Sequence, residues 1–123
     1  MPSIPNNLQD ILLNIWDEET TQDPNWSKEN PSLGQCAATS GALFDLFGLP
    51  LSRCWAITPE GERISHYCNG EDDYTEEQFP EGTVLQLRDG PQGAKARAYL
   101  AENENTESRI ELIKSRILQH ISQ

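Results

Sequence analysis

A short apolar segment in the first half of the chain constrains the fold more than any other feature. Ser32, followed three residues later by Gln35, fits a capping box, the pattern that starts a helix. Gly48 and Pro50 then stop the helix, which would run to Phe47. Its later turns are strongly apolar and its early turns carry small residues, so little of its surface is suited to water. We therefore expect a largely buried central helix.

A second helix is expected near the N-terminus. Residues 6–19 carry apolar side chains at the helical spacing i, i+3, i+4, i+7 and i+8, namely Leu8, Ile11, Leu12, Ile15 and Trp16. Asn6 or Asn7 can cap its start. Residues 20–31 are polar and contain two prolines, which predicts a loop. Trp26 is the one large apolar residue of that loop, and we expect it to be buried.

The last third of the chain is expected to be helical. Residues 95–101 are rich in alanine, and Thr106 can cap a final helix that runs to His120. The apolar stripe of this final helix consists of Ile110, Ile113, Ile117 and Ile121, flanked by Leu112 and Leu118. This spacing predicts a helix with one apolar face.

Strands are expected between these helical regions. Residues 53–58 and 62–68 flank a Pro-Glu-Gly turn, and residues 83–88 alternate apolar and polar side chains. Asn-Gly at 69–70 is the strongest short hairpin signal in the sequence. A second capping box at 75–78 predicts a short helical turn. The order helix, helix, antiparallel sheet, helices predicts an α+β fold with helices packed on a small antiparallel sheet.

Length and charge fit one domain over residues 1–123. A chain of 123 residues is close to the usual domain size and can fold without a disulfide or a metal. We also expect no cofactor. The formal net charge of -11 repels phosphate backbones and anionic lipids. Nucleic acid and membranes are therefore poor partners, whereas a basic protein partner stays open.

The sequence carries no recognisable membrane or targeting segment. No stretch approaches the ~20 apolar residues of a membrane span, and the N-terminus lacks the basic and apolar regions of a secretory signal. The three cysteines are an odd number, and their spacing does not resemble a zinc knuckle. We expect reduced thiols and a cytoplasmic location.

Cys36 is the leading candidate for a chemical role. It falls in the first turn of the predicted central helix, just after Gly34 and Gln35. The N-terminus of a helix has a partial positive charge and unpaired N–H groups, which stabilise a nucleophilic thiolate. The same N–H groups could hold an oxyanion, with Gln35 as a side-chain donor. The alternative is a small buried cysteine that starts a packed helix.

His66 is the matching candidate for a base. It lies in the predicted strand 62–68, whereas the second histidine, His120, falls at the end of the last helix. A nucleophilic cysteine needs a base to take its proton, so His66 is the histidine that we expect near Cys36. The alternative is a histidine whose hydrogen bonds are satisfied within the strand.

The register of the predicted hairpin supplies an acid for His66. With a two-residue turn at 69–70, the expected pairs are Cys68 with Glu71, Tyr67 with Asp72, and His66 with Asp73. Opposed residues point to the same face with Cβ atoms ~5 Å apart, so Asp73 would orient the His66 ring as the acid of a triad. A one-residue slip would bring Asp72 instead, or Asn69 from the turn. A polar hairpin edge without a catalytic role is the alternative.

Two other uses of the cysteines are weaker hypotheses. Cys36, Cys54, Cys68 and His66 could in principle form a zinc set, but no two cysteines are close in sequence, and we expect no metal site. A disulfide between Cys54 and Cys68 across adjacent strands is conceivable. The favoured interpretation is that both are free thiols of the core or of a strand surface.

An ordered set of segments resembles the YunG family of small bacterial proteins. The segments are Trp16-Asp17-Glu18-Glu19-Thr20, Trp26, Pro31, Gly34-Gln35-Cys36-Ala37-Ala38-Thr39, His66-Tyr67-Cys68-Asn69, Asp73-Tyr74-Thr75-Glu76-Glu77-Gln78-Phe79, and Thr106-Glu107-Ser108-Arg109 with Leu112. The resemblance spans nearly the whole chain. The sequence departs from the family in its shorter turn at 69–70 and in Cys68, where the family usually has a large aromatic residue.

The resemblance implies a minimal papain-like architecture, because the family has the Cys, His and Asp order of papain-like folds. In those folds a cysteine on a helix faces a histidine on a sheet. The implied roles fall on Cys36, His66 and Asp73, with Gln35 or Asn69 as accessory residues. The shorter turn leaves the choice among Asp73, Asp72 and Asn69 open.

The sequence thus leads to two main hypotheses about function. The first is a papain-like cysteine hydrolase or acyltransferase that acts on an amide, peptide or related acyl bond of a small molecule or peptide. The second is a non-catalytic domain that binds a small ligand, a peptide or a basic protein. A purely structural role for these segments is a third, weaker hypothesis.

Overall fold

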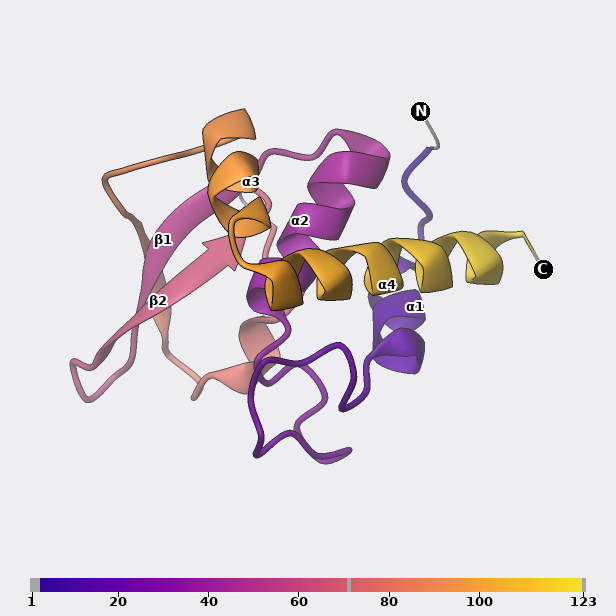
Figure 1. Ribbon diagram of the computed structural model, residues 1–123. Helices are drawn as coiled ribbons and strands as arrows, with labels where there is room; N and C mark the ends of the chain where they lie inside the picture. The colour runs from indigo at the N-terminus through magenta and orange to yellow at the C-terminus, as the bar shows by residue number, and fades with distance from the viewer. Residues whose placement is uncertain (1–2, 71, 123) are drawn as a thin grey trace.

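The computed structural model of the chain describes residues 3–70 and 72–122 (Figure 1). Within these residues four α-helices and a three-stranded antiparallel sheet form an α+β fold, as the sequence predicted. The elements are α1 (Leu8–Ile15), α2 (Cys36–Phe47), β1 (Ser52–Ile57), β2 (Arg63–Cys68), a 3-10 turn η1 (Glu76–Gln78), β3 (Val84–Leu87), α3 (Ala94–Ala101) and α4 (Glu104–Ile121).

Helix α2 lies at the centre of the molecule because it has almost no polar face. Ten of its 12 residues are buried, which confirms the predicted central helix. At Gly41 an added Cβ would lie 2.7 Å from Cδ1 of Ile110, so glycine lets α4 approach closely. The helix ends at Phe47, and Gly48 follows in the left-handed conformation (φ 69°), where its N–H donates to the Phe44 carbonyl.

The start of α2 differs from the predicted capping box. The N-cap is Gln35, which makes no side-chain cap hydrogen bond, and the hydroxyl of Ser32 has no hydrogen-bond partner among the described residues. Instead the backbone N–H of Gln35 donates to the Ser32 carbonyl at 3.1 Å and closes a tight turn. A backbone turn therefore takes the place of the capping box, and Cys36 becomes the first helical residue.

The sheet has the order β2-β1-β3, so β1 is its central strand. Cys54 of β1 is opposite His66 of β2 and opposite Leu87 of β3. The predicted turn between β1 and β2 is present, because the N–H of Thr58 donates to the Glu62 carbonyl at 2.9 Å. Strand β3 is an edge strand whose residues are all exposed. Alternation thus predicted the strand correctly, although neither of its faces is buried.

The chain after β2 does not form the predicted hairpin register. Asn69 pairs with Asp72 through reciprocal backbone hydrogen bonds of 2.9 and 3.2 Å. The expected pair Tyr67 with Asp72 is therefore wrong, and the expected pair Cys68 with Glu71 involves a residue outside those described. The reason is the buried side chain of Asn69, whose Nδ2 donates to the carbonyls of Ser40 and Pro50, both at 3.0 Å.

The N-terminal region keeps its predicted apolar face in a shorter helix. All five residues of the stripe are buried, but α1 ends at Ile15. Trp16 leaves the helix, and its Nε1 donates to Oγ1 of Thr39 at 2.9 Å. The N-cap is Asn7, without a side-chain cap hydrogen bond. Trp26 is only half-buried, contrary to expectation, and its Nε1 donates to the Pro31 carbonyl at the protein surface.

The final helix is capped by Asn103 rather than by the predicted Thr106. The side chain of Asn103 accepts a hydrogen bond from the Thr106 N–H at 3.0 Å. Of the predicted apolar stripe, the first three isoleucines are fully buried: Ile110, Ile113 and Ile117. Ile121, the last residue of α4, is 42% exposed.

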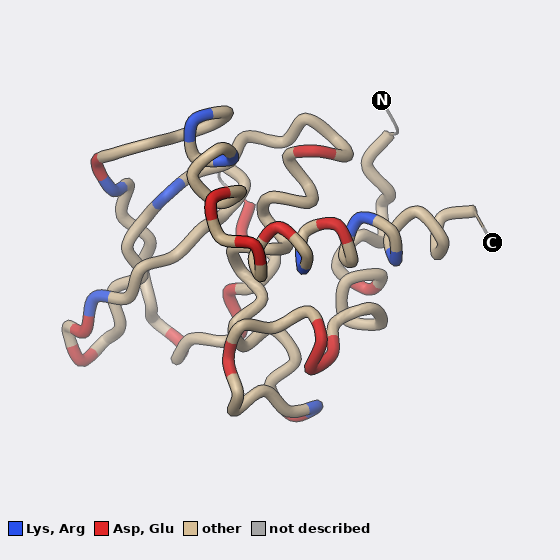
Figure 2. The backbone as a smooth tube through the Cα atoms, viewed as in Figure 1, with Lys and Arg blue, Asp and Glu red and all other residues tan. Residues whose placement is uncertain are grey.

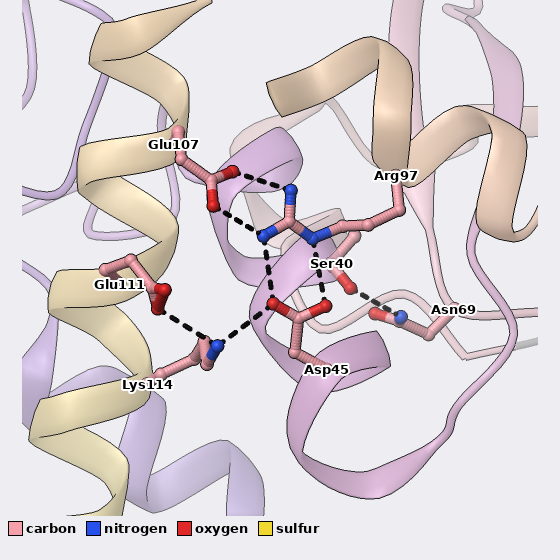
Figure 3. A network of polar contacts seen from close by, with 7 residues as sticks. All are labelled: Ser40, Asp45, Asn69, Arg97, Glu107, Glu111 and Lys114. Atoms are coloured by element: carbon pink, nitrogen blue, oxygen red, sulfur yellow. Dashed lines mark hydrogen bonds and ion pairs between the residues drawn. The ribbon is translucent and has the colours of Figure 1, made fainter. Parts of the chain in front are cut away.

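An ion-pair network joins α2, α3 and α4 (Figure 3). Arg97 of α3 binds Asp45 of α2 with Nε at 2.9 Å and Glu107 of α4 with Nη1 at 2.7 Å. Lys114 adds a contact to Asp45 at 3.1 Å. Burial raises the pKa of Asp45, but the hydrogen bonds from Arg97 and Lys114 more than offset this and keep the pKa below its ordinary value. The network ties the outer helices to the central one.

Acidic residues are distributed over the surface rather than gathered on one face. Figure 2 shows them in the long loop between α1 and α2, at the turn between β1 and β2, and along the first half of α4. None of the helices formed by the described residues is long and apolar enough to cross a membrane.

Candidate active site

Cys36 occupies the first position of α2, where the helix has not yet begun its own hydrogen bonding. The first helical hydrogen bond is donated by the N–H of Thr39 to the Gln35 carbonyl at 3.0 Å. The N–H groups of Cys36, Ala37 and Ala38 precede it. Unpaired N–H groups at a helix start favour negative charge, so they can stabilise a thiolate or an oxyanion at this point.

His66 is fully buried in the middle of β2. Its Nε2 is 2.8 Å from Oδ2 of Asp73, and its ring meets the ring of Phe79 edge-on with centroids 4.9 Å apart. Oδ1 of Asp73 accepts hydrogen bonds from the N–H and the hydroxyl of Thr75, at 3.1 and 3.0 Å. Both carboxylate oxygens are therefore occupied, which fixes the orientation of Asp73 and, through it, of His66.

The contact between His66 and Asp73 arises from a register other than the predicted one. The pair Asn69–Asp72 means that Asp73, the next residue, comes opposite Cys68 if the register continues. Cys68 and His66 lie two positions apart on β2 and so share one face of the sheet. Asp73 thus reaches His66 as a diagonal neighbour rather than as a directly opposed one.

Neither alternative to Asp73 makes this contact. Asp72 is exposed, and its backbone is paired with Asn69. The side-chain amide of Asn69 points to carbonyls of α2 and of the α2–β1 connection, as described above. Of the three candidate partners, Asp73 is therefore the one hydrogen-bonded to the His66 ring.

The two ring nitrogens of His66 face different neighbours. Nε2 is bound to Asp73, whereas Nδ1 is buried and has no hydrogen-bond partner within the described residues. Burial works to lower the pKa of His66, but the hydrogen bond to Asp73 and the interaction with Cys36 raise it to about 10. Cys36 and His66 line the same cavity, although the Cys36 thiol is outside hydrogen-bond geometry with the free nitrogen.

Gln35 is arranged differently from the predicted oxyanion donor. Its side chain is fully buried, and its Nε2 donates to the Asp17 carbonyl at 3.2 Å. The atom left without a partner among the described residues is Oε1, an acceptor, and an oxyanion needs a donor. Gln35 therefore holds the preceding loop against α2, and no contact described here supports the predicted oxyanion role.

Gln22 is a polar residue beside Cys36 that sequence reasoning missed. It is exposed, and it lines two cavities that Cys36 also lines. Its backbone N–H donates to the Gly34 carbonyl at 3.1 Å, which brings the loop to the start of α2. At Gly34 an added Cβ would lie 2.3 Å from Oγ1 of Thr21. The glycine two residues before Cys36 was the only sequence signal of this close approach.

Cys54 and Cys68 form a separate thiol pair behind the site. Their Sγ atoms are 3.5 Å apart, both residues are buried, and both thiols are free. The hydrogen bond with Cys68, together with burial, raises the pKa of Cys54, so this thiol stays protonated. No group of three or more histidine, cysteine or acidic side chains in residues 3–70 and 72–122 is arranged to hold a metal ion.

Comparison with known proteins gives a family and nothing beyond it. The family model described as YunG protein matches residues 4–122. No curated protein and no solved structure matches the chain.

Proposed function

The chain belongs to the YunG family, and on that premise we propose that it is a cysteine hydrolase or acyltransferase with a papain-like arrangement of Cys36, His66 and Asp73. The observation that carries the proposal is the position of His66. One ring nitrogen binds a fixed carboxylate, and the other is left free in a buried site next to a thiol at a helix start. A histidine held in this way can exchange a proton with the thiol.

The chemistry follows from these positions. Sγ of Cys36 bonds to the acyl carbon of an amide, peptide, ester or thioester, and the bond to the leaving group breaks as His66 donates it a proton. The product at this stage is a thioester on Cys36. His66 then takes a proton from water, or from an acceptor amine or alcohol, whose oxygen or nitrogen displaces Cys36. Asp73 binds Nε2 and so fixes the His66 ring throughout, which leaves Nδ1 to exchange protons with the thiol.

The oxyanion of the tetrahedral intermediate would be stabilised at the start of α2. Donors there would be the N–H groups of Cys36, Ala37 and Ala38, which precede the first hydrogen bond of the helix, and the side-chain amide of Gln22, which lines the same cavities as Cys36. A reducing cytoplasm, the predicted location, would keep Cys36 as the free thiol that this chemistry requires.

The first experiment measures the reactivity of Cys36 with iodoacetamide at pH 7, with each cysteine followed by peptide mass mapping. We expect Cys36 to react faster than Cys54 and Cys68, and His66→Gln to slow it by roughly 10–100-fold, because the variant loses the imidazolium whose positive charge stabilises the reactive thiolate. His120→Gln is the matched control, and it should leave the rate unchanged. Equal, slow labelling of all three cysteines would overturn the proposal.

A second experiment looks for the acyl-enzyme itself. An activated ester such as p-nitrophenyl acetate should release a burst of p-nitrophenolate equal to the amount of protein and leave an acetyl group on Cys36. Cys36→Ala should abolish the burst, and Cys68→Ala should retain it. An acetyl group spread over several lysines, with no burst, would count against a thioester intermediate.

A binding domain is the alternative, and the burial of Cys36 favours it. The residue is only 7% exposed, and its thiol is not within hydrogen-bond geometry of the free nitrogen of His66. On this view the cavities hold a small ligand, a peptide or a segment of a basic protein without reaction. It predicts that a lysine-rich peptide protects Cys36 from iodoacetamide while His66→Gln leaves the unprotected rate unchanged.

A further inference from the structure

Cys36 lies where two cavities adjoin. Their volumes are about 430 and 500 Å³, and they share the lining residues Gln22, Cys36 and Ser65. Because Cys36 is among the residues that they share, we refer to the two cavities together as the groove. A substrate whose acyl bond lies at Cys36 would extend from that bond in both directions, so each cavity would receive one side of it. This reasoning rests on the proposed function.

The larger cavity has an uncompensated negative lining, and we call it the acidic cavity. Its charged lining residues other than His66 are Asp23, Glu60 and Glu62, and no lysine or arginine lines it. None of these three carboxylates forms an ion pair within the described part of the chain. His66, which also lines this cavity, is already paired with Asp73. The cavity therefore has no lysine or arginine to balance these three carboxylates.

The buried wall of the acidic cavity also points to a ligand. His66 is fully buried and lines this cavity, and its Nδ1 has no partner among the described residues. A buried polar atom without a hydrogen bond is costly, so a group that enters here and bonds to it gains free energy. The acidic cavity thus contains the proposed catalytic histidine and also carboxylates that would attract a positively charged group.

The smaller cavity has a different character, and we call it the arginine cavity. Arg53 is its only lysine or arginine, and Nε of Arg53 is buried without a hydrogen-bond partner among the described residues. The guanidinium lies over the ring of Tyr99, 5.6 Å from its centroid. Tyr67 and Leu100 add an apolar wall. Glu102 also lines the cavity, but it makes no ion pair with Arg53 within the described residues. A planar guanidinium with free N–H groups suits a carboxylate.

We infer that the groove binds an extended peptide-like chain across Cys36, with a positively charged side chain in the acidic cavity and a carboxylate in the arginine cavity. The substrate class is then a peptide or isopeptide whose scissile bond has a basic group on one side and an acidic group on the other. This substrate preference differs from the one that the net charge of -11 alone predicts. A uniformly negative protein would prefer a substrate with positive groups on both sides.

The test uses four capped tripeptides whose central residue carries a thiol-reactive chloroacetamide. The flanking residues are Lys and Glu, Glu and Lys, two Lys, or two Glu, and the rate of alkylation at Cys36 is measured by mass mapping on the intact protein. One of the two mixed peptides should react at least fivefold faster than the peptide with two lysines, and the peptide with two glutamates should react slowest. The chain direction of the bound peptide decides which mixed peptide is the faster.

Variants assign the preference to its two cavities. Glu60→Gln combined with Glu62→Gln should remove the advantage of lysine over glutamate at the flanking position that the acidic cavity binds. Asp10→Asn combined with Asp89→Asn removes the same charge from residues that line neither cavity, and should leave the order unchanged. Arg53→Gln should equalise the mixed peptide and the peptide with two lysines, and Arg53→Lys should restore part of the difference. The comparison of the four peptides on the unaltered protein stands even if a variant fails to fold.

Failure of the inference and failure of the proposed function give different results. If all four peptides alkylate Cys36 at one rate, or if two lysines give the fastest rate, the charge assignment of the groove is wrong while Cys36 can still be activated. If simple chloroacetamide reacts with Cys36 no faster in the unaltered protein than in His66→Gln, the proposed function itself is wrong.

Discussion

At the scale of single residues, His66 is the group whose charge state matters most. It is fully buried, yet it is held between Asp73 and Cys36, and the balance raises its pKa to about 10. A buried cation is stable only when its partners are close and well oriented. Asp73 is such a partner, because the N–H and the hydroxyl of Thr75 fix its other oxygen.

Stability should therefore fall as the pH rises from neutrality. The pKa of His66 is raised from 6.5 to about 10, so protonation stabilises the fold fully below pH ~6.5, and this contribution is lost as the pH rises through 10. We expect the free energy of unfolding in urea to drop by roughly 2–4 kcal/mol across this window. In Asp73→Asn the drop should be much smaller, because an amide does not stabilise an imidazolium. An equal drop in both proteins would contradict the assignment.

At the scale of elements, the apolar patterns predicted the helices well, and the polar motifs predicted local contacts badly. The burial of α2 and its end at Gly48 follow from composition and from a backbone preference, and both are local properties. The short helical turn predicted at 75–78 is present as η1, but neither capping box forms its side-chain hydrogen bond, because both hydroxyls lie in tertiary surroundings. The Ser32 hydroxyl is buried without a partner among the described residues, and the Thr75 hydroxyl donates to Asp73.

The candidate site was predictable in its members and less so in its geometry. Cys36 at a helix start and His66 on a strand could be read from the sequence. The contact of His66 with Asp73 came from a register that is wrong, since Asn69 is anchored on α2 and shifts the pairing. Gln22 was not predicted, because Gly34 was the only local signal that residues 20–23 fold back on the start of α2.

The closeness of that loop to α2 gives a prediction at the element scale. Gly34→Ala should destabilise the protein by roughly 2–4 kcal/mol, because the residue has φ +72° and an added Cβ would lie 2.8 Å from the backbone nitrogen of Asp23. Gly61→Ala is the matched control, with φ +88° and open space around the added Cβ. This variant should lose only about 1 kcal/mol of the free energy of unfolding, because the unfavourable backbone conformation is then the only cost. If urea unfolding shows that the two variants lose similar free energies of unfolding, the packing of the loop against Gly34 contributes nothing to stability.

At the scale of the whole molecule, the outer helices support the central one through apolar and ionic contacts together. Ile110, Ile113 and Ile117 of α4 are fully buried, and Arg97 of α3 links Asp45 to Glu107. None of these residues lines either half of the groove. The side chains that make these contacts are thus distinct from those that line the groove, although α3 and α4 contribute to both.

Loss of the shared carboxylate should weaken this support. Asp45→Asn leaves Arg97 and Lys114 without a charged partner on α2, and we expect it to lower the free energy of unfolding by roughly 1–3 kcal/mol. Glu111→Gln removes only an exposed i, i+3 pair with Lys114 and should cost less than about 0.5 kcal/mol. Urea unfolding of the two variants checks this order, and the reverse order would show that the network is not structurally important.

On the proposed function, the placement of the three buried isoleucines also bears on when Cys36 would become reactive during synthesis. Chains emerge from the ribosome N-terminus first, so Cys36, His66 and Asp73 leave it well before α4 does. Helix α2 nevertheless needs Ile110, Ile113 and Ile117 to cover its apolar surface. A nascent chain that stops before α4 would carry three ordinary thiols, and the activation of Cys36 that we propose would arise only as the last helix docks.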